Sequence, residues 1–188
     1  MMHTTRAVAD GARIFLVDDL KDYLEFLQMI LKNHLPGADI ASFSNGPDAI
    51  EAARDDPPDL ILLDAKMPDV DGFVVCEQLK KDPRTAVVPV LMISGVFTDT
   101  EHRVRGLETG ADGYICKPFI PEELVAQIRV LLRIKSDEDQ LRKHEQELEH
   151  RLEDRAGALR ESEARYRSLT DEVLDSSSVG LFILDSEL

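Results

Sequence analysis

The sequence predicts an α/β fold in which five parallel strands alternate with helices that cover both faces of the sheet, a doubly wound (βα)5 domain. Three observations lead to it. Between residues 13 and 134, short apolar runs alternate with segments whose apolar residues recur at helical spacing. Several of these runs are apolar on both faces, which is typical of a parallel sheet buried between helices. A long charged segment of helical composition then follows the domain.

The order of the elements follows from these runs and from the turn residues between them. Strands are expected at residues 14–17, 38–41, 60–63, 87–93 and 113–116. Three helices are expected where apolar residues recur within 23–31, 49–53 and 73–79. A fourth helix fits residues 99–108, closed by Gly110, and a fifth starts at Pro121, because proline is tolerated in a first helical turn.

Composition excludes several classes of protein. The chain has 188 residues, 43% of them apolar, and 37 acidic against 22 basic side chains, a net charge of −15. This acidity disfavours nucleic-acid or anionic-membrane surfaces. Cys76 and Cys116 have neither disulfide nor metal-site spacing and are expected to be reduced core thiols. Neither a signal peptide nor a membrane-spanning run is present, so a cytoplasmic location is expected.

Acidic side chains follow the ends of two adjacent predicted strands. Asp18, Asp19 and Asp64 lie there without a basic residue among them, so a hard cation such as Mg²⁺ would relieve their repulsion. Ser94 and Lys117 follow two further strands, and they would supply donors to phosphate oxygens from the other side of the crevice. This set suits phosphoryl transfer with Asp64 as the nucleophile, which would form an aspartyl phosphate.

Each of these residues also has an ordinary structural explanation when taken alone. Asp18 or Asp19 could cap the next helix, and Asp64 could open a turn. Ser94 could belong to a turn, and Lys117 could be a solvated surface charge. We prefer the functional interpretation because the whole set follows successive strands in the order that a parallel sheet requires.

Four motifs resemble the receiver domain of two-component response regulators. They are Val17-Asp18-Asp19, Leu63-Asp64-Ala65-Lys66-Met67-Pro68-Asp69-Val70-Asp71-Gly72, Ser94-Gly95 and Tyr114-Ile115-Cys116-Lys117-Pro118-Phe119. The resemblance covers roughly residues 12–135 and implies a flavodoxin-like fold. It also implies that Asp64 accepts a phosphoryl group from a phosphohistidine, carried by a sensor histidine kinase or a histidine phosphotransfer protein.

The resemblance also assigns roles to the other residues of the set. It implies that Mg²⁺ is held by Asp18, Asp19, Asp64 and the main-chain carbonyl of Lys66. Lys117 would pair with the phosphoryl group, and the Lys117-Pro118 peptide would be cis. Ser94 and Tyr114 would form a switch pair that remodels the face of helix four, strand five and helix five. Serine at 94, glycine at 95 and lysine at 66 depart from the commonest pattern, which leaves the lifetime of the phosphorylated state open.

Residues 136–171 lack proline and have a weak heptad pattern. One position of this pattern is formed by Leu131, Leu152, Leu159, Tyr166 and Val173, and the partner position by Ile134, Leu141, Leu148 and Leu169. Glu138, Glu145, Arg155 and Ser162 interrupt it. Both a parallel dimeric coiled coil and a single solvated connector remain open. His144 and His150 lie in a charge run typical of a solvated helical face, so they are not expected to carry a phosphoryl group.

The predicted domain boundaries follow from these segments. Residues 1–11 form a disordered N-terminus, 12–135 the receiver, 136–172 a helical coiled-coil linker, and 173–188 a truncated start of a further domain. Residues 159–169, followed by an expected strand at 179–185, resemble the entry helix and first strand of a PAS sensor domain. The simplest account is the front of a hybrid signalling protein, and the histidine kinase or cyclic-dinucleotide output that could follow is not in these residues.

The sequence as a whole predicts a phosphorylation-controlled receiver. It would catalyse only its own phosphorylation and dephosphorylation, and it would signal through helix five and a homodimeric coiled coil to the next domain. Three alternatives remain: a receiver-fold dimerisation platform that no longer switches, a phosphate sink or relay, and a metal-dependent phosphohydrolase. The cognate kinase, the stimulus, the PAS ligand and the dimer geometry are not encoded in a form that can be recognised.

Overall fold

The computed structural model describes residues 10–68, 70–95 and 109–184. The chain divides into two compact units, residues 1–139 and residues 140–188. The fourth helix predicted at residues 99–108 lies outside the described residues. Within the predicted N-terminal tail, Asp10 and Gly11 form a turn, and the amide of Gly11 donates to the carbonyl oxygen of Gly37 at 2.8 Å.

The first unit contains a five-stranded sheet, and all four of its strand pairings are parallel. Its order is β2-β1-β3-β4-β5, so the second strand lies at one edge and the fifth at the other. The strands are β1 (Arg13–Val17), β2 (Asp39–Phe43), β3 (Leu60–Asp64), β4 (Val90–Ser94) and β5 (Gly113–Cys116). The predicted parallel doubly wound fold is confirmed, since this order is that of flavodoxin-like sheets.

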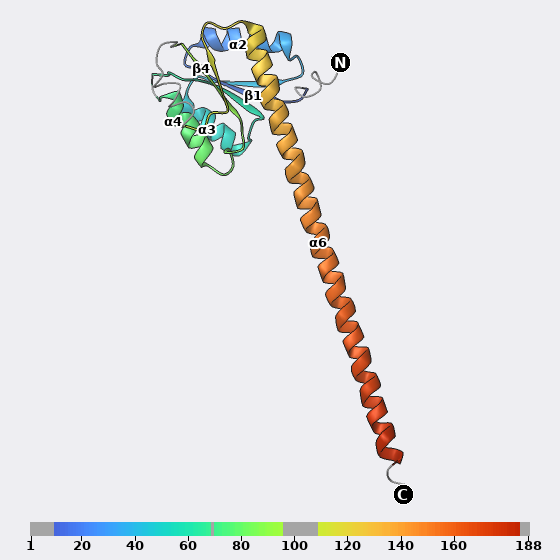
Figure 1. Cartoon of the computed structure of the whole chain (residues 1–188). Coiled ribbons are helices and arrows are strands. Elements are labelled where there is room, and N and C mark those ends of the chain that lie inside the picture. The colour runs from blue at the N-terminus through green and yellow to red at the C-terminus, as the bar shows by residue number, and fades with distance from the viewer. Residues whose placement is uncertain (1–9, 69, 96–108, 185–188) are drawn as a thin grey trace. The chain divides into compact units, whose positions relative to one another are not determined.

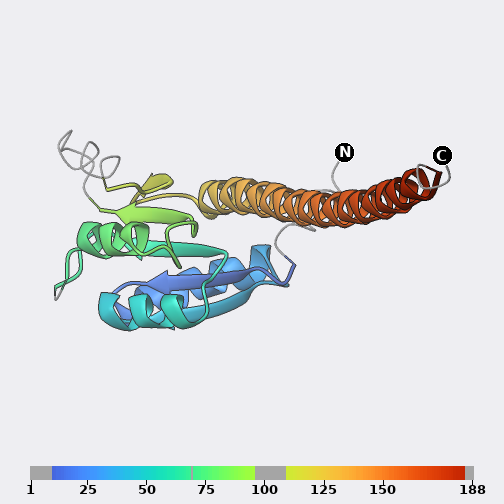
Figure 2. The same cartoon turned by 90° about the horizontal axis from the view of Figure 1, so that it is seen from below.

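Helices cover both faces of this sheet. They are α2 (Lys21–His34), α3 (Gly46–Asp55), α4 (Gly72–Lys81) and the long C-terminal helix α6 (Pro121–Leu184). Figure 1 shows α2 and the start of α6 on one side of the sheet, with α3 and α4 on the other. The view from below in Figure 2 has α3 and α4 in front of the strands. The predicted long helix that begins at Pro121 is therefore present.

Two apolar cores follow from the alternation of side chains along the strands. Ile14, Leu62 and Ile115 belong to the core under α2 and α6. Phe15, Leu63 and Met92 point the other way, into the core under α3 and α4. Because neighbouring side chains of a strand face opposite sides, central strands need apolar residues at nearly every position. The continuous apolar runs of the sequence are explained by this double burial.

Helices α3 and α4 each follow a residue whose side chain accepts a hydrogen bond from an amide of the first helical turn. Asn45 precedes α3, and its side-chain oxygen accepts from the amide of Asp48 at 2.9 Å. Asp71 does the same for α4, accepting from the amide of Phe73 at 3.0 Å. Such caps satisfy donors that have no partner inside the helix. They fix where each helix begins, close to the carboxyl ends of the strands.

Two strand predictions depart from the structure by three residues or more, and the other strand limits agree within two residues. The run at 87–93 becomes a strand only from Val90, because Pro89 has no amide for a ladder and residues 83–87 form a turn. The strand predicted at 179–185 is wrong for residues 179–184, which continue helix α6. A lone strand would leave its backbone groups unpaired, whereas a helix satisfies them within itself. The PAS resemblance stays a prediction.

Both cysteines are free thiols, but Cys116, predicted to lie in the core, is only half-buried. Cys76 is buried in α4, and burial raises the pKa of its thiol to about 11. Among the helices that the structure describes, none combines the length and apolar character needed to cross a bilayer.

Candidate functional site

Two buried carboxylates lie at the carboxyl edge of the sheet. Asp18 follows the last residue of β1, and Asp64 is the last residue of β3, the neighbouring strand. Asp18 is 2% exposed and Asp64 is 7% exposed. Parallel strands bring these residues together because their carboxyl ends meet at one edge. Asp19, the next residue, is half-buried at the same edge.

Lys117 joins the two carboxylates. Its ammonium Nζ lies 2.7 Å from Oδ1 of Asp64 and 3.3 Å from Oδ2 of Asp18. The residue follows β5, and its own amide donates to the carbonyl oxygen of Ser94 at 2.6 Å. The peptide between Lys117 and Pro118 is cis, as the resemblance implied. Three of the predicted site residues therefore form one charged cluster, although they lie far apart in the sequence.

The remaining oxygens of the two carboxylates accept from nearby amides. Oδ2 of Asp64 accepts from the amide of Lys66 at 2.8 Å, and Oδ1 of Asp18 accepts from the amide of Leu20 at 2.9 Å. Helix α2 begins without a side-chain cap, so neither Asp18 nor Asp19 is a helix cap. The side chain of Lys66 is exposed. These bonds fix the orientation of both carboxylates.

Burial has an electrostatic cost at Asp18. Removal of its carboxylate from water raises its pKa, and the nearby charge of Asp64 acts in the same direction. The amide of Leu20 and the ammonium of Lys117 oppose this rise. Two buried carboxyl groups are thus held close together, and the ammonium between them favours the ionised form of Asp18.

The donor set fits a hard divalent cation. The ammonium of Lys117 already sits between two carboxylate oxygens, which shows that this point favours positive charge. Across the residues that the structure describes, no group of three or more metal-ligating side chains is close enough to form a ready-made metal site. The roles predicted for Asp19 and for the carbonyl of Lys66 stay predictions.

The two predicted switch residues lie on adjacent strands. Ser94 is buried at the end of β4, one residue beyond the Asp64–Ile93 pair, and it faces Cys116 of β5. Tyr114 pairs with Met92 inside the sheet and packs against the core under α3 and α4. Its hydroxyl is buried and has no hydrogen-bond partner within the described part of the chain. Their switching role is not tested by this geometry.

Tyr23 is a site residue that the sequence interpretation missed. Its ring lies under the ammonium of Lys117, with Nζ 3.7 Å from the ring centroid, which is the geometry of a cation–π interaction. Burial, followed by the charges of Asp18 and Asp64, raises the pKa of its phenol, which therefore stays neutral. In the sequence Tyr23 is only one of the apolar residues of a helical pattern, and no local signal distinguished it.

Gly72 allows α4 to begin directly against the site. A β-carbon at this position would meet the main-chain oxygen of Asp64 and the α-carbon of Ala65. The amide of Gly72 donates to the carbonyl oxygen of Ala65 at 3.1 Å. The segment after β3 is therefore held against the amino end of α4 by main-chain contact, which requires a residue without a side chain.

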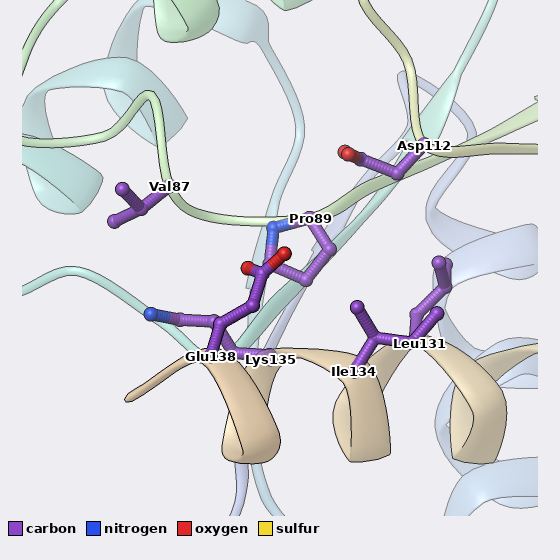
Figure 3. A pocket seen from close by; sticks show the side chains of 7 residues that line it. All are labelled: Val87, Pro89, Asp112, Leu131, Ile134, Lys135 and Glu138. Atoms are coloured by element: carbon purple, nitrogen blue, oxygen red, sulfur yellow. The ribbon is translucent and has the colours of Figure 1, made fainter. Parts of the chain in front are cut away.

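A separate cavity lies at the opposite edge of the sheet. It has a volume of about 190 Å³, is partly open to solvent, and is lined by the segments that precede β4 and β5 and by one face of α6. Figure 3 shows Pro89 and Asp112 facing Leu131 and Ile134 of α6 across this space. Since these segments precede the strands, the cavity is distinct from the carboxylate cluster at the strands' carboxyl ends.

The chain is similar to known proteins over most of its first unit. The profile of the "Response regulator receiver domain" family matches residues 14–129. The chain is 44% identical over 126 residues to the DNA-binding response regulator MtrA of Mycobacterium tuberculosis, covering 67% of this chain and 53% of that protein. It is 38% identical over 135 residues to the response regulator PleD of Caulobacter vibrioides, covering 72% of this chain and 29% of that protein.

The fold is similar to those of solved receiver domains. A CheY-like response regulator receiver domain protein of Methanospirillum hungatei superposes with a TM-score of 0.62 at 27% identity, covering 68% of this chain and 98% of that one. The chain spans about half the length of the MtrA proteins that it matches.

Proposed function

Because this chain belongs to the response regulator receiver domain family of two-component systems, we propose that Asp64 accepts a phosphoryl group from a phosphohistidine. The donor is a sensor histidine kinase or a histidine phosphotransfer protein. The observation that carries the proposal is the 2.7 Å contact between Asp64 and Lys117 at the carboxyl edge of the sheet. A buried carboxylate with an adjacent ammonium is suited to attack phosphorus and to neutralise the charge that follows.

The transfer step is a single displacement at phosphorus. One carboxylate oxygen of Asp64 forms a new oxygen–phosphorus bond while the nitrogen–phosphorus bond of the phosphohistidine breaks. The electron pair of the broken bond stays on the histidine nitrogen. Lys117, held by Asp18 and by the ring of Tyr23, is placed to pair with the incoming phosphoryl oxygens. Asp64 needs no separate base, because carboxylates are ionised at neutral pH.

Asp18, Asp19, Asp64 and the main-chain carbonyl of Lys66 would hold Mg²⁺ in this proposal. The support is the donor chemistry, in which oxygens of two buried carboxylates already converge on one positive charge. When bound, the ion would neutralise charge on the phosphoryl oxygens. Asp18 and Asp64 orient their carboxylates through the amides of Leu20 and Lys66.

The signal would leave the site through Ser94 and Tyr114. In this proposal the hydroxyl of Ser94 moves toward the phosphoryl group, and Tyr114 turns inward, which remodels the face near β5 and α6. The buried Tyr114 hydroxyl supports this, since its movement breaks no hydrogen bond of a described residue. Helix α6 then carries the change to a homodimeric coiled coil and a downstream PAS domain, and two chains pair partly through the remodelled face.

Phosphorylation of the whole chain by acetyl phosphate and Mg²⁺ tests the proposal. Intact mass should increase by one phosphoryl group, and Asp64→Asn should abolish this increase. Light-scattering mass, measured on the same samples, reports whether the phosphorylated chain pairs differently. Removal of Mg²⁺ with a chelator should slow the reaction strongly, because the carboxylates then repel the anionic donor.

Each failure has a distinct meaning. A wild-type chain that is not phosphorylated, while its oligomeric state stays constant, would favour a dimerisation platform that no longer switches. Transfer from phosphorylated Asp64 to a histidine phosphotransfer protein, faster than loss to water, would favour a phosphate sink or relay. Multiple turnover of a phosphate ester that is lost in Asp64→Asn would favour a phosphohydrolase.

A further inference from the structure

The second unit presents a row of exposed leucines on one helix. Four side chains, which we call the leucine stripe, are between 56% and 66% exposed: Leu141, Leu148, Leu152 and Leu159. Their spacings are seven, four and seven residues, so they lie along one narrow face of α6. A narrow apolar face on an otherwise charged helix fits a second helix better than a sheet, which needs a broader stripe.

Two charged residues occupy positions of this same face. Glu145 lies four residues after Leu141, and Arg155 lies three residues after Leu152, so both take core positions of the heptad. Their side chains are exposed in the single chain. In any two-helix assembly along the leucine stripe they come close to the partner helix. Their partners across the interface then decide which orientation of the two helices is stable.

A parallel, in-register pair of chains sets like charges against each other. Every residue of the face meets its own copy, so Glu145 faces Glu145 and Arg155 faces Arg155. Like charges at core positions destabilise a coiled coil, and partial burial increases the penalty. Each core position and its counterpart on the partner helix form one layer of the interface. The four leucine layers would form, but the layers at Glu145 and Arg155, two of the six between residues 141 and 159, would be repulsive.

We propose that the leucine stripe pairs with a second copy of this chain in antiparallel orientation, with the twofold axis near residue 150. Core positions whose numbers add to 300 then meet. Leu141 packs against Leu159 of the second copy, and Leu148 packs against Leu152. In the same register Glu145 meets Arg155 of the second copy, and symmetry repeats this pair. Every leucine layer is kept, and both charged layers become complementary.

The positions that flank the core do not change this preference. A parallel pair would gain an exposed contact between His144 and Glu149 of the second copy. An antiparallel pair would bring two copies of Glu149 together on one side of the core and two copies of Arg151 together on the other. Exposed pairs of this kind contribute little, because water and salt screen them. Complementary charge at the core positions therefore decides the orientation.

Antiparallel pairing constrains how the receiver domains can meet. A parallel coil places both receiver domains of a dimer at the same end, and an antiparallel coil places them at opposite ends. Pairing of two receiver faces after phosphorylation of Asp64 would then require the coil to open or to join a second dimer. The leucine stripe would thereby act as a resting contact that competes with the parallel assembly.

Charge reversal at Glu145 and Arg155 tests the antiparallel orientation. Glu145→Arg and Arg155→Glu, each made alone in the whole chain, should weaken dimerisation at least tenfold, because each sets like charges together in the antiparallel register. The double exchange should restore wild-type affinity. In a parallel pair each single variant only replaces one like-charge layer by another, so the four dissociation constants would be similar. Sedimentation equilibrium measures all four constants.

Disulfide cross-linking tests the register directly. A mixture of Leu141→Cys and Leu159→Cys chains should give a mixed disulfide dimer under mild oxidation, whereas each variant alone should give none. In the antiparallel register two copies of residue 141 are separated along the axis by 18 residues, or about 27 Å. The unsubstituted chain, which keeps Cys76 and Cys116, provides the baseline.

The outcomes separate this proposal from that of phosphoryl transfer. Restoration by the double exchange together with the mixed disulfide would support the antiparallel pair. Homotypic disulfides of each variant, or a chain that stays monomeric at every concentration, would overturn it. Phosphorylation of Asp64, read by intact mass, is independent of both measurements, so one proposal can fail while the other stands.

Discussion

Helix α6 has two regions that use leucine in different ways. In its first five turns Leu124, Ile128 and Leu132 are no more than 3% exposed, because they pack on the same face of the sheet as α2. Beyond residue 140 the leucine stripe is more than half exposed. The first region buries a broad face with pairs of adjacent apolar residues, and the second offers a narrow face with one or two leucines per heptad. The width of the face thus reflects the partner: a sheet within the chain or a helix outside it.

The largest expected effect is a loss of stability on truncation of a buried leucine in the first region. Leu132→Ala should lower the free energy of unfolding of the first unit by about 2–5 kcal/mol, because it leaves a cavity in the core shared with α2. Hydrogen exchange of the amides of β3, a central strand whose five residues are all buried, measures this change.

Leu152→Ala is the matched control, since it makes the same change on the same helix. It should leave the exchange of β3 within about 0.5 kcal/mol of wild type, because Leu152 is 65% exposed in the single chain. Equal losses in the two variants would show that the two regions are not energetically distinct.

Much of the first unit could be predicted from the sequence because its signals are local. The apolar run 60–63 lies within β3, and the run 113–116 coincides with β5. Helix α6 begins at Pro121, as predicted. Asp18, Asp64 and Lys117 could be grouped because each follows a parallel strand, and parallel strands end at one edge. In these cases position along the chain determines position in space.

Other features depend on contacts that no local pattern encodes. Tyr23 of α2 meets Lys117, which follows β5, only in the folded domain, and its spacing in the sequence is that of any core residue. The strand expected at 179–185 was inferred from a short apolar run after a serine-rich segment, and such a run does not distinguish a strand from a helix. Without partner strands, residues 179–184 continue as helix. Long-range packing, rather than local preference, decides such cases.

Replacing a glycine by alanine gives a second comparison, because the expected change in stability has opposite signs in the two units. Gly72→Ala should destabilise the first unit by at least about 2 kcal/mol, because the new β-carbon collides with the main chain of Asp64 and Ala65. Gly157→Ala should stabilise the helix of the second unit by about 0.5–1 kcal/mol, because nothing lies within 4 Å of the added carbon and alanine favours helix.

Urea unfolding followed by circular dichroism, together with exchange at β3, distinguishes the two glycine variants. Each variant is the control for the other, because both replace glycine by alanine but in different units. A neutral Gly72→Ala would mean that α4 can move away from the phosphoacceptor without cost. A destabilising Gly157→Ala would indicate that a partner approaches the backbone there.

The smallest expected effect compares the tyrosines of the two units. Tyr23→Leu should slow phosphorylation of Asp64 by acetyl phosphate about fivefold, which corresponds to roughly 1 kcal/mol, because the ring no longer holds the ammonium of Lys117. Tyr23→Phe keeps the ring face and should react at nearly the wild-type rate. Tyr166→Leu, in the second unit at a side chain that is 70% exposed, should leave the rate unchanged.

The Tyr23→Phe variant distinguishes the effect of the aromatic ring on Lys117 from the effect of the Tyr23 hydroxyl. If Tyr23→Phe were as slow as Tyr23→Leu, the hydroxyl rather than the ring face would matter. If Tyr23→Leu reacted as fast as wild type, the contacts of Lys117 with Asp18 and Asp64 would be enough to hold it. The expected order, with phenylalanine near wild type and leucine slower, would arise because an aromatic face attracts a cation and an aliphatic side chain of similar bulk does not.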